Sequence, residues 1–172
     1  NIEWICQAAS PYMVSKLAAE ALIFDLCPHV VVVRPGMVVW NSATGEHNPT
    51  DAISRLVAAI LSESLVWHSS QGSADDICDG VNVDSFCEAA WALFKHGGPA
   101  VYNVQGTFCL TSTLQACDAP ISGVAYESWY NTMVQKCTAE ADHVLAPLLP
   151  HIAKDEPPFV IGSSGSLLSW KV

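Results

Sequence analysis

Hydrophobic positions near the N-terminus follow first a helical and then a continuous pattern. Across residues 11–26 apolar side chains recur at helical spacing, with Ser10 at the capping position and Pro11 in the first turn, which predicts a helix. A Cys-Pro step ends this pattern, and the β-branched run that follows at 29–35 is typical of a strand buried in a parallel sheet. A helix followed by such a strand predicts half of a parallel α/β unit.

The next stretch combines a long polar loop with a helix. Residues 36–50 are rich in glycine, asparagine, serine and proline, and the length of the stretch indicates a functional rather than a merely connecting loop. A helix is expected over 51–65, capped by Asn48 or Thr50. The loop and helix together form a unit at 36–65.

The C-terminal half alternates short strands with helices. A polar loop is expected over 67–80, with a short strand near Ile77, and Asp84 is expected to cap a helix at 85–96 that a Gly-Gly pair ends. A short strand is predicted at 99–106. Further predictions are a helix at 109–119, a short strand or the beginning of a helix at 124–129, and one or two amphipathic helices at 130–149, with no assignment for 156–172.

The composition indicates one domain, or a large part of one, with apolar surface to spare. Among 172 residues, 51% are hydrophobic and 14% are charged, whereas soluble domains typically carry about 25% charged residues. The chain can therefore bury a sizeable core, and some apolar surface is expected to await a partner.

The charge balance excludes two classes of partner. Seventeen acidic residues oppose seven basic ones, the net charge is -10, and the only arginines are Arg34 and Arg55. Neither nucleic acid nor an anionic membrane is an expected partner, because no basic patch exists to bind phosphate. A membrane span is not expected either, since no apolar run reaches the length that a spanning helix needs.

The cysteines and the first residue suggest the setting of the chain. The seven cysteines are scattered, with no two-residue gap between any pair, which favours reduced thiols in a cytoplasmic protein over disulfides or a zinc site. No secretory or transit signature opens the chain, and its first residue is asparagine rather than methionine. We therefore expect a piece of a longer cytoplasmic protein.

Two residues on the first predicted helix have the chemistry of a catalytic pair. Tyr12 and Lys16 are four residues apart, so their side chains project from one face of the helix. A nearby ammonium favours the phenolate over the phenol, and a tyrosine tuned in this way can exchange a proton with a carbonyl or an alcohol. A Tyr-x-x-x-Lys match also arises by chance, so the pair alone identifies nothing.

The pair belongs to a longer series of motifs. The sequence "YMVSKLAAE" followed by "VVVVRPGMVV" resembles the extended short-chain dehydrogenase/reductase superfamily. Within it, "NSATGEHNPTDAISRLVAAIL" is similar to the thioester reductase domains that release products from nonribosomal peptide synthetases, polyketide synthases and carboxylic acid reductases. "GVNVDSFCEAAWAL", "VYNVQG" and "YESWY" resemble later segments of these domains in the same order, so the resemblance covers about residues 10–130.

The resemblance implies roles for the residues that match. It implies that Tyr12 is the general acid at the carbonyl being reduced, and that Lys16 holds the nicotinamide ribose of NADPH. The remaining implied positions fall into two groups: Pro35, Gly36 and Val38 facing the nicotinamide ring, and His47, Asn48 and Asp51 bordering the pocket for the acyl chain. No metal is implied.

The sequence also departs from the family. A Gly-rich turn between a strand and a helix, which receives the pyrophosphate of a dinucleotide, is not recognisable; the nearest imitation, Gly162-Ser-Ser-Gly165, lacks that context. The family's catalytic Ser or Thr would fall before the first residue. The expected fold is thus α/β: the C-terminal part of a Rossmann-like parallel sheet plus a mainly helical substrate lobe, without the nucleotide-binding half. The predicted divisions are 1–106 for the Rossmann-like part, including the 36–65 unit, 107–155 for the C-terminal substrate lobe and 156–172 for a tail.

Three functions remain open at this point. The first is a part of an NADPH-dependent thioester reductase that releases a chain bound to phosphopantetheine on a carrier domain, as an aldehyde or an alcohol. The second is a reductase-like release domain that cyclises its product by Dieckmann-type condensation without a redox step. The third is a non-catalytic module that docks an acyl carrier, or that pairs through its exposed sheet edge with a missing N-terminal half or with a second copy.

Other polar and aromatic residues have simpler interpretations. His29 is expected to lie at a strand boundary, and Trp129 and Tyr130 to anchor the core. The remaining histidines outside the 36–50 loop repeat no zinc or triad spacing and are expected to be solvated or capping; they are His68, His96, His143 and His151. Asp75, Asp76 and Asp79 lack the glycine and glutamate of a calcium loop and indicate a solvated acidic loop.

Overall fold

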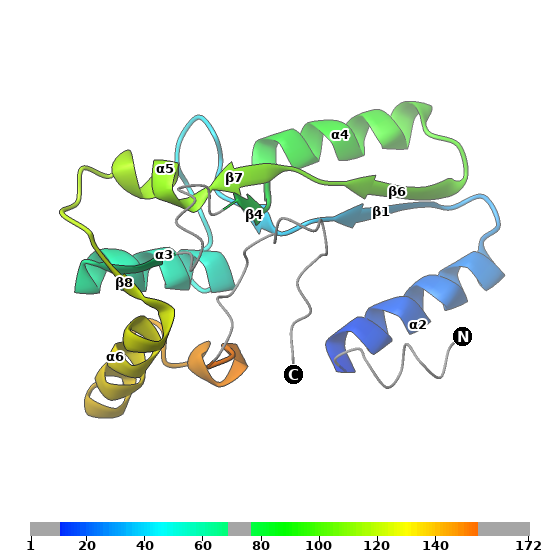
Figure 1. Ribbon diagram of the computed structural model, residues 1–172. Coiled ribbons are helices and arrows are strands. Elements are labelled where there is room, and N and C mark those ends of the chain that lie inside the picture. The colour runs from blue at the N-terminus through cyan, green and yellow to red at the C-terminus, as the bar shows by residue number, and fades with distance from the viewer. Residues whose placement is uncertain (1–10, 69–76, 155–172) are drawn as a thin grey trace.

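The computed structural model describes residues 11–68 and 77–154 (Figure 1). The elements are, in order, α2 (Pro11–Leu26), β1 (Val31–Pro35), β2 (Val38–Val39), α3 (Ala52–Glu63), β3 (Leu65–His68), β4 (Ile77–Asp79), β5 (Val81–Asn82), α4 (Val83–His96), β6 (Ala100–Val104), β7 (Thr107–Cys109), α5 (Leu110–Gln115), β8 (Ser122–Ala125), α6 (Tyr126–Ala139) and the 3-10 helix η1 (Leu149–His151). Three predicted features lie outside the described residues: the tail at 156–172, the Gly162-Ser-Ser-Gly165 patch and most of the acidic loop.

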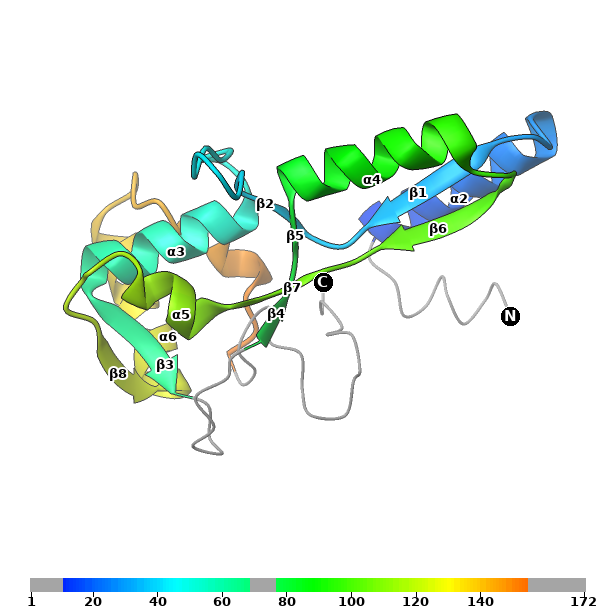
Figure 2. The ribbon, with the colours of Figure 1, turned by 90° about the horizontal axis from the view of Figure 1, so that it is seen from above.

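The strands pair in parallel, as the β-branched run predicts. β1 pairs with β6 in parallel, from Val31 opposite Ala100 to Pro35 opposite Val104. β2–β5 and β3–β8 are also parallel, and only β4–β7 is antiparallel among the described pairs. Helices α2 and α4 lie on opposite faces of the β1–β6 ribbon in both views (Figures 1 and 2). The mixed α/β fold with parallel strands is confirmed.

The core lies away from this ribbon, in a lobe that combines α3, β3, α5, β8, α6 and η1. Its fully buried large side chains come from four of these elements and from the segment after α6: Ile53, Leu56 and Ile60 of α3, Trp67 of β3, Leu110 of α5, Trp129 and Met133 of α6, and Leu145 after α6. The expectation that Trp129 anchors the core is confirmed. Because the core joins residues on both sides of position 106, α3 and β3 pack with the C-terminal segments (Figure 2).

The two helices on the ribbon expose their apolar side chains instead. All the large hydrophobic residues that are exposed in the described parts of the chain belong to α2 or α4: Tyr12, Leu17, Leu22, Ile23, Leu26, Trp91 and Phe94. Helix α4 has no buried residue. The expected spare apolar surface is therefore concentrated around the β1–β6 ribbon.

Two predicted helix caps are wrong. Helix α3 is capped by Asp51, whose Oδ1 accepts the amide N–H of Ser54 at 2.8 Å, while the Oδ1 of Asn48 already accepts the amide and hydroxyl of Thr50. Helix α4 begins at Val83, so the predicted cap Asp84 lies in its first turn, which leaves its carboxylate free to bind another segment. Both errors arise because the predicted capping side chains bind other groups: Asn48 and Thr50 bind each other, and Asp84 binds Ser42.

The segments after β6 resolve two alternatives. Residues 124–129 complete a short strand, β8, and also begin helix α6, so both predicted forms occur in succession. The amphipathic stretch at 130–149 ends its helix at Ala139, and turns lead from there to η1. In the described part of the chain, no helix is long and apolar enough to cross a membrane.

Candidate functional site

The predicted pair lies on the exposed face of α2. Lys16 Nζ is 5.2 Å from the centroid of the Tyr12 ring, so the ammonium lies over the aromatic face, as the four-residue spacing predicts. Tyr12 is 69% exposed. Its side chain is therefore open to a ligand rather than enclosed in the core.

An ion pair joins α2 to the strand that follows it. Arg34 Nε donates to Glu20 Oε2 at 2.8 Å, and Arg34 Nη2 donates to the other carboxylate oxygen. The hydrogen bond from Arg34 lowers the pKa of the Glu20 carboxyl, and the same bond raises the pKa of the guanidinium. Since no α2 residue of described exposure is buried, this two-pronged pair fixes the helix against β1.

The residues after Arg34 lie where the parallel strands end. The amide of Gly36 donates to the carbonyl of Val104 at 2.9 Å, which places Pro35 and Gly36 beside the carboxyl end of β6. Val38 lies opposite Val81 in the β2–β5 pair. The carboxyl edge of a parallel sheet is where α/β folds bind ligands. Of the three residues that the resemblance assigns to the nicotinamide ring, Pro35 and Gly36 thus lie at this edge, and Val38 begins the neighbouring strand in the chain, β2.

The loop after β2 folds back on itself. Asn41 Oδ1 accepts the amides of Ala43 at 2.9 Å and Thr44 at 3.0 Å, and the amide of Asn41 donates to the carbonyl of Glu46 at 2.8 Å. Gly45 has a φ of +71°, which other residues adopt at a cost, and its amide donates to the Asn41 carbonyl at 2.9 Å. The loop is therefore a compact hydrogen-bonded turn.

The three residues assigned to the acyl pocket follow this turn. His47 and Asn48 are exposed, and their polar atoms bind neighbouring loop groups: His47 Nδ1 donates to the Gly45 carbonyl at 3.1 Å, and Asn48 accepts from Thr50. Asp51 is the cap of α3. Among described residues, no hydrogen bond joins Tyr12 or Lys16 to this loop. The structure therefore does not link the pair on α2 directly to the three residues assigned to the acyl pocket.

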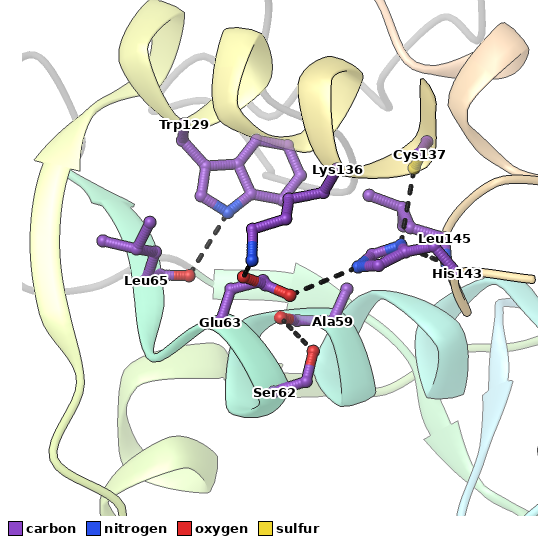
Figure 3. Close-up of polar contacts among 9 residues, drawn as sticks. All are labelled: Ala59, Ser62, Glu63, Leu65, Trp129, Lys136, Cys137, His143 and Leu145. Carbon is purple, nitrogen blue, oxygen red and sulfur yellow. Dashed lines mark hydrogen bonds and ion pairs between the residues drawn. The ribbon is translucent and has the colours of Figure 1, made fainter. Parts of the chain in front are cut away.

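The structure reveals a polar cluster that sequence reasoning missed (Figure 3). Glu63, at the end of α3, binds Lys136 Nζ at 2.8 Å and lies 3.5 Å from His143 Nε2. On the other side of the ring, His143 Nδ1 accepts the Leu145 amide at 3.2 Å and lies 3.4 Å from Cys137 Sγ. His143 is buried, which corrects its predicted solvated or capping role; its ring lies between Glu63 of α3 and Cys137 of α6.

This cluster has the connectivity of a triad but not its chemistry. Burial raises the pKa of the Cys137 thiol, and the nearby Glu140 and Glu63 carboxylates raise it further, so the sulfur stays protonated. The single acceptor atom of His143, Nδ1, is already engaged by Leu145. The cluster therefore holds α3, α6 and the segment after α6 together. Glu63 lies far in the sequence from the other members, which all fall between Lys136 and Leu145, so no local pattern could reveal the cluster.

The remaining candidate chemistry is also structural. Cys27, Cys87, Cys109, Cys117 and Cys137 form no disulfide bond. Within residues 11–68 and 77–154, no group of three or more His, Cys, Asp or Glu side chains is arranged to hold a metal ion.

Comparison with known proteins places these motifs in a family. The family model described as "Male sterility protein", an NAD-binding family, matches residues 5–90, and no curated protein matches the chain. Among solved structures, the terminal R domain from the myxalamid PKS-NRPS biosynthetic pathway is 20% identical, with a TM-score of 0.68 over 82% of this chain and 37% of that one.

Two further reductase structures share the fold. The PhqB reductase domain from Penicillium fellutanum is 17% identical, with a TM-score of 0.69 over 94% of this chain and 44% of that one. The reductase domain of a nonribosomal peptide synthetase from Mycobacterium tuberculosis is 24% identical, with a TM-score of 0.59 over 73% of this chain and 35% of that one. The chain thus spans less than half the length of each structure, and at these identities the likeness shows the fold.

Proposed function

We propose a function from the premise that this chain belongs to the NAD-binding male sterility protein family: it is part of an NADPH-dependent thioester reductase that releases a carrier-bound acyl or peptidyl chain. Three solved structures that share its fold are an R domain from a PKS-NRPS pathway, the R domain of a nonribosomal peptide synthetase and the PhqB reductase domain. The single observation that carries the proposal is the Tyr12–Lys16 pair, exposed on one face of α2, the helix before the strand that ends in Arg34-Pro35 and is followed by Gly36.

The residues fit one end of a nicotinamide cofactor. Lys16 offers an exposed ammonium to a ribose hydroxyl, and the backbone at Pro35 and Gly36 ends at the carboxyl edge of the sheet. NADPH would supply a hydride to the thioester carbonyl carbon. The described residues do not include a pyrophosphate site of the usual kind, because no described strand leads into a helix through a Gly-rich turn. The described residues therefore account for the nicotinamide end only.

In the proposed chemistry, Tyr12 transfers a proton and Lys16 stabilises the charge that this transfer leaves. As negative charge develops on the carbonyl oxygen, the Tyr12 hydroxyl donates its proton there, and the Lys16 ammonium stabilises the phenolate that remains. When this hydroxyl adduct collapses, its O–H proton returns to the Tyr12 phenolate, the carbon–sulfur bond breaks and the sulfur takes a proton from water, so that an aldehyde and a thiol leave. The thiol belongs to phosphopantetheine, and a second reduction would give the alcohol.

The substrate side of the proposal uses the loop after β2. His47 and Asn48 are exposed and lie on a compact turn, and Asp51 fixes the beginning of α3 beside them. We assign the acyl pocket to these residues. The proposed divisions of the chain remain 1–106, 107–155 and 156–172. The proposed partners are a carrier domain and either a separate N-terminal half or a second copy, in the cytoplasm.

The experiment is a calorimetric titration of the chain with NADPH, together with two site variants and one control. Lys16→Ala should weaken binding by about tenfold or more, because one charged hydrogen bond is lost, whereas Tyr12→Phe should leave binding unchanged and abolish thioester reduction. The control is Lys95→Ala on α4, where Lys95 Nζ lies over the Trp91 ring at 4.6 Å, a matched geometry without the proposed role.

Each alternative outcome has a defined meaning. If the wild-type chain does not bind NADPH, the cofactor part of the proposal is wrong for this chain. If it forms a cyclised product from a carrier-bound substrate without NADPH, the Dieckmann-type alternative replaces reduction. Equal losses in Lys16→Ala and Lys95→Ala would show that the effect is one of surface charge alone.

A further inference from the structure

The loop that carries His47 and Asn48 is held from outside by the beginning of α4. The amide of Ser42 donates to Asp84 Oδ1 at 2.9 Å, and the Ser42 hydroxyl donates to Asp84 Oδ2. These bonds join positions that are 42 residues apart in the sequence. They lower the pKa of the Asp84 carboxyl, so it is ionised near neutral pH.

A second set of bonds fixes the base of the same loop. The Asn82 side chain and the Val83 amide both donate to the Trp40 carbonyl, at 3.0 and 3.3 Å. The Trp40 ring packs edge-on against Phe108, with their centroids 5.1 Å apart. The base of the loop therefore has anchors that do not involve the Asp84 carboxylate.

We propose that Asp84 is a positioning residue for the acyl-thioester site: through Ser42 it holds the turn at 41–46 so that His47 and Asn48 are presented to the substrate. The inference rests on the proposed function for the identity of the ligand. Its structural basis is that the other bonds of the turn, from Asn41, Gly45 and Glu46, lie within the turn itself. They keep the shape of the turn but do not fix its direction.

The expected effects differ among three variants. Asp84→Ala removes both bonds and should free the turn, which weakens binding of octanoyl-pantetheine by about tenfold, because a smaller fraction of the chain has the binding conformation. Ser42→Ala retains the amide bond and should cause a smaller loss. Asp84→Asn can still accept the Ser42 amide and can donate to its hydroxyl, so it should restore wild-type binding to within about twofold.

The test measures the dissociation constant for octanoyl-pantetheine by NMR titration and amide hydrogen exchange of peptides that cover 41–46. Exchange should accelerate by about tenfold in Asp84→Ala. The control is Glu88→Ala, which removes an exposed carboxylate from the same helix; the Glu88 side chain makes no hydrogen bond or ion pair with the described residues. Thermal unfolding of each variant separates positioning from loss of the fold.

The outcomes separate this inference from the proposed function. Unchanged binding in Asp84→Ala, or an equal loss in Glu88→Ala, would overturn the inference. Failure of the wild-type chain to bind octanoyl-pantetheine would overturn it as well, together with the proposed substrate. If the wild-type chain binds the thioester but transfers no hydride, only the reductase chemistry fails, and the graded series still decides the role of Asp84.

Discussion

Replacing Trp129 by phenylalanine tests where the core of this protein lies. Trp129 is completely buried on α6, its ring packs edge-on against Trp67 with centroids 4.8 Å apart, and its Nε1–H donates to the Leu65 carbonyl at 3.2 Å. The substitution loses this hydrogen bond, worth about 1 kcal/mol. It also removes roughly three buried ring atoms, worth about 2 kcal/mol with the cavity that they leave. We therefore expect a loss of about 3 kcal/mol in the free energy of unfolding.

Urea unfolding followed by far-UV circular dichroism measures this loss without relying on tryptophan fluorescence. In a thermal scan, about 3 kcal/mol corresponds to a midpoint lower by roughly 6–12 °C for a chain of this size. Trp91→Phe is the matched control, since Trp91 is 57% exposed on α4, and it should change stability by less than about 0.5 kcal/mol. A loss below about 1 kcal/mol for Trp129→Phe, or equal losses in both variants, would refute the assignment of the core to the α3–α6 lobe.

Two further predictions concern ion pairs. Arg34→Ala should speed amide exchange throughout α2 relative to Asp25→Asn on the same helix, because the bonds to Glu20 fix a helix in which no residue of described exposure is buried; equal exchange in both variants would contradict this. The hydrogen bond from Lys136 is the main cause of the lowered pKa of Glu63, whose ordinary value is 4.5. The stabilisation that ionised Glu63 gives the fold is therefore present above 4.5 and is lost as the pH falls through the lower pKa of the folded state. Below about pH 5, stability should decline more steeply in the wild-type chain than in Glu63→Gln, as measured by urea unfolding at successive pH values.

Local sequence patterns predicted the elements that depend on local chemistry. The helix at Pro11–Leu26 and the strand at Val31–Pro35 follow from apolar periodicity, a proline in the first turn and a β-branched run. The same segments carry the motifs that resemble thioester reductases, and the family match supports that resemblance. The spacing of Tyr12 and Lys16 also predicted their shared face, since helix geometry alone sets it.

Patterns failed where two polar groups competed for one partner. Asn48, Asp51 and Asp84 all have side chains that can cap a helix, and the sequence cannot rank them. In the structure, Thr50 engages Asn48, and Asp84 binds Ser42, so Asp51 caps α3 and Asn82 precedes α4. Such competition is decided by which groups the fold brings within hydrogen-bond distance.

The sequence by itself determined the secondary structure around Tyr12 and Lys16, the parallel character of the strands and the family. Only the tertiary structure decided that His143 is buried beside Glu63 and Cys137, that the core joins α3 to α6, and that Asp84 holds the loop after β2. The physical reason is the range of the forces involved. Helix and strand preferences act over a few residues, whereas burial and side-chain hydrogen bonds join segments 42 to 89 residues apart that become neighbours only when the chain folds.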